Sequence, residues 1–149
     1  MNLHGSHHFA APRARVFDAI RDPRVLMAVI PGCEGVEQTG PDEYLGRIRL
    51  RLPGAVGSYR TTVRLVDVVA PERAGLDALV EGAMGSITGR ADFTLADADG
   101  GTAMDYRGSG TIDGPLARLD SRFAERLAES LIAQGLKALE LRLATEGSE

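Results

Sequence analysis

The spacing of apolar residues changes twice along the chain, and the long middle stretch between the two changes constrains the fold most. From Val36 to Asp113, apolar and polar residues alternate, which is typical of half-buried strands. Turn-forming residues interrupt the alternation at five places, which are Gly40-Pro41-Asp42, Pro53-Gly54, Pro71-Glu72, Gly85-Ser86 and Asp99-Gly100-Gly101. Five turns separate six strands, so the simplest arrangement is a series of consecutive antiparallel hairpins.

The segments before this stretch predict one strand and two short helices. Residues 3–9 alternate and predict a first strand. Residues 12–22 carry apolar side chains at helical spacing, with a proline in the first turn, where helices tolerate it. Residues 23–30 predict a second, shorter helix, which also starts at a proline and which Pro31 ends.

Helical spacing returns after Asp113-Gly114-Pro115. We expect one continuous helix from Pro115 to about Thr145, capped by Asp113 or Gly114 and ~45 Å long at 1.5 Å per residue. Its apolar stripe consists of Leu116, Leu119, Phe123, Leu127, Leu131, Leu136, Leu139 and Leu143. The order β-α-α-β-β-β-β-β-β-α predicts a single α+β domain over residues 1–149, in which a curved seven-stranded antiparallel sheet packs around the long C-terminal helix.

Composition excludes several classes of protein. The net charge is −4, aromatic residues make up 5% of the chain and tryptophan is absent, which argues against a nucleic-acid binder. No stretch approaches the ~20 apolar residues of a membrane span, and the N-terminus does not resemble a signal peptide. A single cysteine allows no internal disulfide and fits a reducing compartment. We therefore expect a cytoplasmic protein.

Small residues on the inward face of the sheet raise the question of a cavity. Alternation places the following small residues on the side that faces the long helix: Gly46, Ala78, Gly82, Gly89, Ala91, Gly108 and Gly110. They could curve the sheet and let the helix lie close, or they could leave an apolar cavity for a ligand. Both interpretations stay open at this point.

If a cavity exists, its lining is expected to come from inward strand residues and from the apolar faces of the helices. The predicted ligand-binding residues are Leu26, Ile30, Tyr44, Ile48, Val63, Val80, Met84, Ile87, Phe93, Met104, Tyr106, Leu119, Phe123 and Leu127. We expect an apolar small molecule to bind there, and no cofactor.

Groups able to perform chemistry are scarce on the inward face. The polar inward residues are Tyr44, Tyr59, Thr61, Tyr106 and a half-buried His7, and no carboxylate joins them from the last five strands. No catalytic residues are predicted from spacing. His4 and His8 lie ~13 Å apart along one strand face, too far to share a metal ion, so no metal site is predicted. The neighbouring Glu34 raises the expected pKa of Cys33, which favours a structural thiol over a reactive one.

Arginines gather on the outward face of two adjacent strands. They are Arg47, Arg49, Arg51, Arg60 and Arg64. This face could dock an anionic surface, either lipid headgroups or an acidic protein. Alternatively it is a solvated face on which Asp77 and Glu81 of the next strand supply cross-strand partners.

Several motifs resemble the family of the carbon monoxide dehydrogenase G-subunit. They include an opening strand with Gly5, a helix with a "VFDAI" core, "D-P-x-V-L" at residues 22–26, and "I-P-G-C-E" at residues 30–34, followed by a strand near Tyr44. The segment "DGPLARLDSRFAERLAESLIAQGLKAL" is similar to the family's C-terminal helix. The resemblance covers essentially the whole chain and implies the helix-grip fold of the START-like, or SRPBCC (polyketide cyclase/lipid transport), superfamily.

This resemblance also implies a function. It points to a non-catalytic carrier or adaptor that binds a lipid or quinone and partners a molybdenum-containing, carbon monoxide dehydrogenase-type hydroxylase, at the inner face of the membrane. One alternative is a START-like cyclase or hydratase acting on an apolar substrate, with Tyr44 and Tyr106 as acid or oxyanion donors converging in the cavity. Another is a structural interaction module with a filled core.

Overall fold

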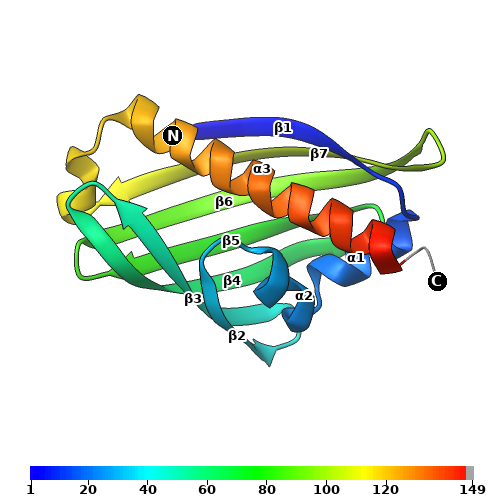
Figure 1. The fold of residues 1–149 in the computed structure, drawn as a ribbon, viewed down its shortest axis with the longest axis horizontal. Coiled ribbons are helices and arrows are strands. Elements are labelled where there is room, and N and C mark those ends of the chain that lie inside the picture. Colours follow the sequence, from blue (N-terminus) through cyan, green and yellow to red (C-terminus); the bar gives the residue numbers. More distant parts are fainter. Residues whose placement is uncertain (147–149) are drawn as a thin grey trace.

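A seven-stranded antiparallel sheet curves around one long helix (Figure 1). The computed structural model describes residues 1–146, so the last three residues of the predicted domain lie outside the described part. The elements are β1 (Asn2–Phe9), α1 (Arg13–Ile20), α2 (Pro23–Val29), β2 (Cys33–Gly40), β3 (Glu43–Leu52), β4 (Ala55–Val69), β5 (Arg73–Gly82), β6 (Gly85–Ala98), β7 (Gly101–Asp113), the 3₁₀-helix η1 (Gly114–Arg118) and α3 (Ser121–Glu146). The predicted α+β helix-grip fold and its element order are confirmed.

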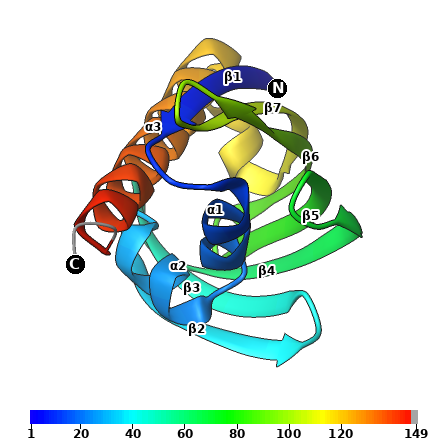
Figure 2. The same ribbon diagram turned by 90° about the vertical axis from the view of Figure 1, so that its right-hand side faces the viewer.

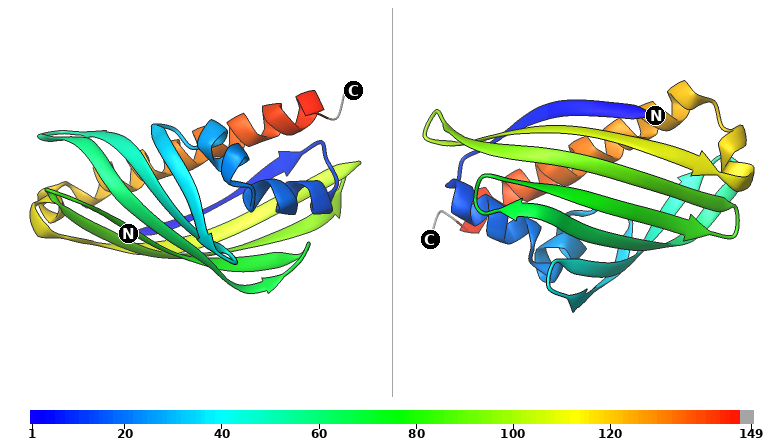
Figure 3. Two further views of the ribbon diagram at one scale, coloured as in Figure 1. Left: turned by 90° about the horizontal axis from the view of Figure 1, so that it is seen from below. Right: turned by 180° about the vertical axis from the view of Figure 1, so that it is seen from behind.

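The strand order in the sheet is β1-β7-β6-β5-β4-β3-β2. Strands β2 to β7 form the expected consecutive hairpins, and β1 joins the sheet beside β7 with Leu3 opposite Gly108. β1 and β2 are therefore the two edge strands, and α1 and α2 connect them across one end of the sheet (Figure 2). Helix α3 crosses one face diagonally, while the other face carries no helix (Figure 3).

The C-terminal helix is shorter than the sequence predicts. Residues 114–118 form η1, the backbone at Leu119 is extended, and α3 begins only at Ser121. Asp120, and not Asp113 or Gly114, caps α3, because its carboxylate accepts hydrogen bonds from the backbone N–H groups of Arg122 (2.8 Å) and Phe123 (3.2 Å). The interruption lets Leu116 turn inward and become buried against the sheet. The 26 residues of α3 span roughly 39 Å.

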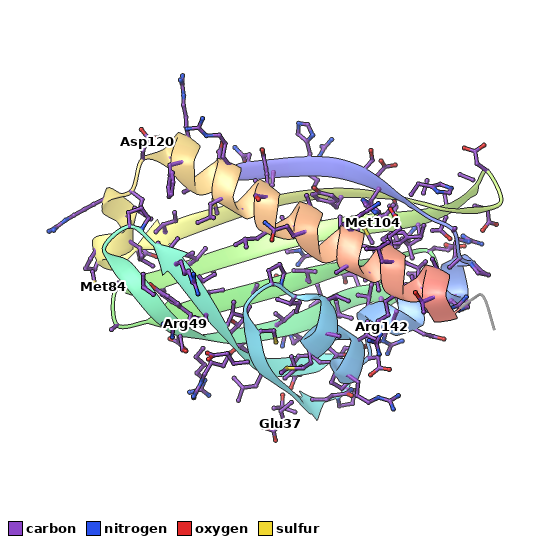
Figure 4. All side chains as sticks on the ribbon, in the orientation of Figure 1. Glu37, Arg49, Met84, Met104, Asp120 and Arg142 are labelled. Carbon is purple, nitrogen blue, oxygen red and sulfur yellow. The ribbon has the colours of Figure 1, made fainter. Side chains whose placement is uncertain are left out.

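The turn between β5 and β6 also differs from the prediction. It consists of Ala83 and Met84, and Gly85 is already the first residue of β6, with a φ of +130° that favours glycine. Met84 is therefore not an inward strand residue. Its side chain is 36% exposed at the end of the molecule, as Figure 4 shows.

Two separate clusters of buried side chains hold the helices to the sheet. The larger one, here called the packed end, fills the space under α1, α2 and the C-terminal part of α3 with Phe9, Ala11, Val16, Phe17, Ala19, Val25, Val29, Ala74, Phe93, Leu95, Met104, Leu139 and Leu143. The smaller one joins η1 to β3 and β4 through Leu52, Tyr59 and Leu116. Between the clusters, inward residues of the central strands such as Val63, Leu76 and Val80 are only half-buried. A completely filled core would bury them, so the space beneath the helices is partly hollow.

Candidate functional site

An apolar cavity of about 210 Å³ lies between α2 and the neighbouring strands. We call it the α2 cavity. Its lining comes from α1, from α2 and the turn that follows it, and from β2 to β5, and consists of Ile20, Leu26, Ile30, Cys33, Val36, Tyr44, Gly46, Ile48, Thr61, Val63, Leu65 and Leu76. None of these side chains is charged, so the cavity suits an uncharged, mostly apolar molecule.

The turn after α2 positions the outer wall of this cavity. Pro31 follows the helix, and Gly32 adopts a φ of +75°, where a side chain would also collide with the carbonyl oxygen of Arg49. The backbone N–H of Arg49 donates to Gly32 O at 2.8 Å, and that of Cys33 donates to Ile30 O at 3.1 Å. These bonds fix the turn to β3, so Ile30 and Cys33 are held over the sheet.

A missing side chain on β3 contributes to the hollow. Gly46 lies opposite Val36 of β2 and opposite Thr61 of β4 in the two strand ladders. All three residues line the α2 cavity. Because glycine contributes no side chain, space remains beside Thr61 that a larger residue would occupy.

Polar atoms around the cavity are few, and two of the three polar residues are already engaged. The Tyr44 hydroxyl donates to Arg21 O at 2.7 Å, and burial raises the pKa of this phenol. The Cys33 thiol contacts Gly35 O at 3.5 Å, and burial raises its pKa as well, so the thiol stays protonated. The Thr61 hydroxyl is buried and has no hydrogen-bond partner among residues 1–146.

The structure brings five of the predicted site residues together in the α2 cavity. They are Leu26, Ile30, Tyr44, Ile48 and Val63. Ile87, Leu119 and Leu127 line a separate hollow of about 80 Å³ under the first half of α3, and Val80 packs against the same cluster. We call this smaller space the α3 hollow. The expected single wedge beneath the long helix is therefore divided, and its larger part lies under α2.

The remaining predicted residues lie outside both spaces. Phe93 and Met104 are buried in the packed end, where they fill space and line no cavity (Figure 4). Tyr106 packs against the same cluster, Phe123 lies half-buried in the first turn of α3, and Met84 is in the exposed turn. Inward orientation was predicted correctly for most of these positions, but α1, α2 and α3 cover them closely.

Sequence reasoning left several cavity residues out of the predicted site. These are Ile20, Cys33, Val36, Gly46, Thr61, Leu65 and Leu76. The signal was present for Gly46, Thr61, Leu65 and Leu76, because alternation placed all four on the inward face. For Ile20 and Val36 no signal existed, because their position depends on how α1 and the edge strand fold over the sheet.

Most of the glycines in the sheet serve close packing and leave no cavity. The ring of Tyr106 lies over Gly5, its cross-strand neighbour, and the ring of Tyr59 lies 2.8 Å from where a Cβ of Gly82 would be. Met1 covers Gly110 in the same way. Of the inward glycines, only Gly46 lines the α2 cavity.

The two tyrosines proposed as catalytic donors are not brought together. Tyr44 lines the α2 cavity, but its hydroxyl is bonded to the backbone at the end of α1. Tyr106 lies on β7 over Gly5, on the other side of the sheet's centre. The structure therefore offers no pair of convergent hydroxyls for acid or oxyanion chemistry.

The histidines are engaged in separate contacts. His7 Nε2 lies 2.9 Å from a carboxylate oxygen of Glu140, and His8 Nε2 lies 3.1 Å from Ala98 O. Within residues 1–146, no group of three or more His, Cys, Asp or Glu side chains is placed to hold a metal ion.

The outward arginines of β3 and β4 are exposed and form no ion pair with any other described residue. Asp77, an expected partner, instead bonds Arg90 at 3.3 Å. Arg47 and Arg60 are direct cross-strand neighbours, an arrangement of like charges that destabilises a sheet. Figure 4 shows Arg49 on the same part of β3.

A larger open depression of about 770 Å³ lies across the sheet on this outer side. Polar and charged side chains such as Thr62, Arg64, Asp77 and Arg90 line much of it. It is therefore poorly suited to an apolar ligand, and the α2 cavity is the better candidate site. No helix within the described residues is long and apolar enough to cross a lipid bilayer.

Comparison with solved structures identifies the fold. A conserved protein from Geobacillus kaustophilus superposes with a TM-score of 0.91 at 23% identity, covering 97% of this chain and 96% of that one. A START superfamily protein from Mycobacterium smegmatis gives 0.73 at 12% identity, with 97% of both chains covered. The di-domain ARO/CYC StfQ of the steffimycin biosynthetic pathway gives 0.71 at 9% identity, covering 99% of this chain and 52% of that one.

At these identities the structural matches establish the START-like fold alone. No curated protein gives a significant sequence match. The family model described as the carbon monoxide dehydrogenase G-subunit (CoxG) matches residues 5–144, which is nearly the whole chain. Family and fold together suggest a ligand-binding or cyclase-type protein. The chain belongs to the CoxG family of carbon monoxide dehydrogenase.

Proposed function

We propose that this protein is a non-catalytic carrier that binds an apolar molecule, of the lipid or quinone type, in the α2 cavity. The observation that carries the proposal is the cavity itself, which is uncharged and lined almost entirely by aliphatic side chains. An isolated empty space of this kind is costly in a protein core, and ligand binding accounts for its presence.

The size of the α2 cavity limits what part of a ligand it can hold. An apolar cavity of about 150 Å³ is known to bind benzene, so about 210 Å³ accommodates one substituted ring or a short aliphatic chain. A complete long-chain lipid exceeds that volume. A lipid- or quinone-like ligand would place its ring in the cavity, and its chain would leave past the half-buried residues of α2 and β2.

The same geometry favours a carrier over a cyclase or hydratase. Catalysis on an apolar substrate needs an acid, a base or an oxyanion donor beside the reacting atom. In the α2 cavity the thiol of Cys33 stays protonated, the hydroxyl of Tyr44 is bonded to the backbone, and Tyr106 lies elsewhere. Nothing around the cavity pairs a nucleophile with a base.

Native mass spectrometry and solvent extraction of the freshly purified protein test this proposal. We expect a bound apolar molecule, and we expect added short-chain quinone or monoacyl lipid to raise the melting temperature. An empty extract together with an unchanged melting temperature for every added apolar compound would contradict the carrier function.

As a second part of the proposal, the carrier works beside a molybdenum hydroxylase of the carbon monoxide dehydrogenase type at the cytoplasmic face of the membrane. The family description supports the enzyme partner. The exposed, unpaired arginines of β3 and β4 support contact with an anionic surface, because such a surface would relieve the repulsion between Arg47 and Arg60.

Flotation with phosphatidylglycerol and phosphatidylcholine vesicles tests the membrane contact. The protein should bind only the anionic vesicles, and Arg47→Glu combined with Arg60→Glu should abolish binding. Arg107→Glu, on the outward face of β7, is the matched control and should bind like the wild type. Equal binding of both vesicle types would contradict the membrane contact, and analytical ultracentrifugation with purified carbon monoxide dehydrogenase tests the enzyme partner separately.

A further inference from the structure

Two buried threonines of the same sheet differ in how their hydroxyl groups are satisfied. Thr102 on β7 is 0% exposed, and its hydroxyl donates to Ala11 O at 2.6 Å. Thr61 on β4 is 8% exposed, and its Oγ1 has no partner in the described part of the chain. Buried hydroxyl groups are nearly always hydrogen-bonded in native proteins, so the Thr61 hydroxyl requires an explanation.

The position of Thr61 connects its unpaired hydroxyl with the candidate site. Its side chain lines the α2 cavity, between Gly46 on one neighbouring strand and Val80 on the other. Tyr44, the polar residue that β3 contributes to the lining, has its hydroxyl committed to Arg21 O. Valine has the same shape as threonine and would fill this place without burying an unpaired oxygen, so packing alone does not account for a threonine here.

We propose that the Thr61 hydroxyl is the hydrogen-bonding group that receives the polar atom of the bound ligand. This inference rests on the proposed carrier function. Rotation about χ1 exchanges the hydroxyl with the methyl group and presents Oγ1 to the space that Gly46 leaves open. The ligand therefore enters with its polar atom pointing toward the centre of β4.

The chemistry of the lining defines the class of ligand. A hydroxyl group both donates and accepts, so it binds a ketone, a quinone-type carbonyl or a phenol equally well. A carboxylate or an amine would be buried without a counter-charge, because no charged side chain lines the cavity. The cavity volume of about 210 Å³ limits the inserted part to a compact ring system. The ligand, or its inserted part, is an uncharged ring bearing a single carbonyl or hydroxyl group.

Isothermal titration with 1-indanone and indane tests this inference, because the two molecules share a ring skeleton and differ in one carbonyl group. The wild type should bind 1-indanone roughly 3- to 10-fold more tightly than indane, as one net hydrogen bond predicts. Thr61→Val keeps the shape and should bind both compounds equally, with the affinity for indane unchanged. Thr61→Ser keeps the hydroxyl and should retain the preference for 1-indanone.

Three outcomes would overturn the inference, and they separate it from the carrier function. If the wild type binds both compounds with equal affinity, or if Thr61→Val keeps the preference, the α2 cavity binds ligands but Thr61 does not read their polar atom. If neither compound binds the wild type, the carrier function fails and this inference fails with it. Circular dichroism of both variants shows that the fold is retained.

Discussion

The packed end and the α2 cavity are built on the same sheet, but they obey opposite rules. In the packed end, α1 and the last turns of α3 press aromatic rings together, and the rings of Phe17 and Phe93 have their centroids 6.0 Å apart. Under α2 the inward strand residues are aliphatic or small, and the short helix covers them without filling the space. The difference indicates that rigidity is concentrated at one end and ligand binding at the other.

This comparison is also visible in the polar groups. At the packed end the buried Thr102 hydroxyl ties β7 to the segment before α1, so a polar group is used to fasten the chain. In the α2 cavity the Thr61 hydroxyl fastens nothing among the described residues. A structural role leaves a polar group bonded within the protein, whereas a binding role leaves it free for a partner.

The largest difference should appear when one leucine is shortened in each region. Leu95 is 3% exposed in the packed end, and Leu95→Ala should lower the free energy of unfolding by about 3–4 kcal/mol, since it leaves a new cavity. Leu76 is half-buried beside an existing cavity, so Leu76→Ala should cost only about 1–2 kcal/mol.

Urea denaturation of both alanine variants measures this contrast. The two strands β5 and β6 are neighbours, so the backbone context of the leucines is closely matched. Equal losses would show that the α2 cavity is filled by side chains in solution.

The sequence predicted the fold well because period and turn chemistry are local properties. Alternation identified the inward side of every hairpin strand, and the prolines located the ends of the short helices. The interruption before α3 escaped prediction because Leu116 and Leu119 fit a helical stripe equally well, while burial of Leu116 decides against a continuous helix.

The site was predicted less completely because alternation gives the face of a residue and not what covers it. Phe93, Met104 and Val63 all point inward, yet only Val63 lines the α2 cavity. The path of α2 and α3 over the sheet decides between them, and that path depends on contacts between distant segments such as His7 and Glu140.

A second contrast comes from replacing each buried threonine by valine. Thr102→Val removes the hydroxyl that satisfies Ala11 O and should cost about 1–3 kcal/mol. Thr61→Val removes an oxygen without a partner and should leave the unliganded protein equally stable or more stable, by up to about 1 kcal/mol. Thermal and urea unfolding of both variants provide the measurement. A destabilised Thr61→Val would assign that hydroxyl to the fold.

Filling the α2 cavity should reduce binding without weakening the fold at the packed end. Val63→Phe places a ring in the cavity, and the affinity for 1-indanone should fall roughly tenfold or more, which corresponds to about 1.4 kcal/mol. Val69→Phe is the matched control, because it makes the same change at a position of β4 that is 39% exposed. If both variants bind like the wild type, the ligand occupies another part of the molecule.

The smallest effect is expected where β1 is fastened to α3. Glu140 accepts a hydrogen bond from Lys137 at 2.8 Å and lies 2.9 Å from His7 Nε2, and these contacts, with Lys137 the larger cause, lower the pKa of its carboxyl. A carboxyl whose pKa is lowered by folding stabilises the protein above its unfolded pKa, and this contribution disappears as the pH falls through the folded value.

Glu140→Gln should therefore cost about 0.5 kcal/mol at pH 7, as for a partly exposed ion pair, and nothing at a pH well below the ordinary glutamate value of 4.5. Urea denaturation at both pH values measures the change. Glu129→Gln, exposed on α3, is the control and should have little effect at either pH. A loss that persists at acid pH would show that Glu140 acts through packing, so the packed end would extend along α3 without help from charge.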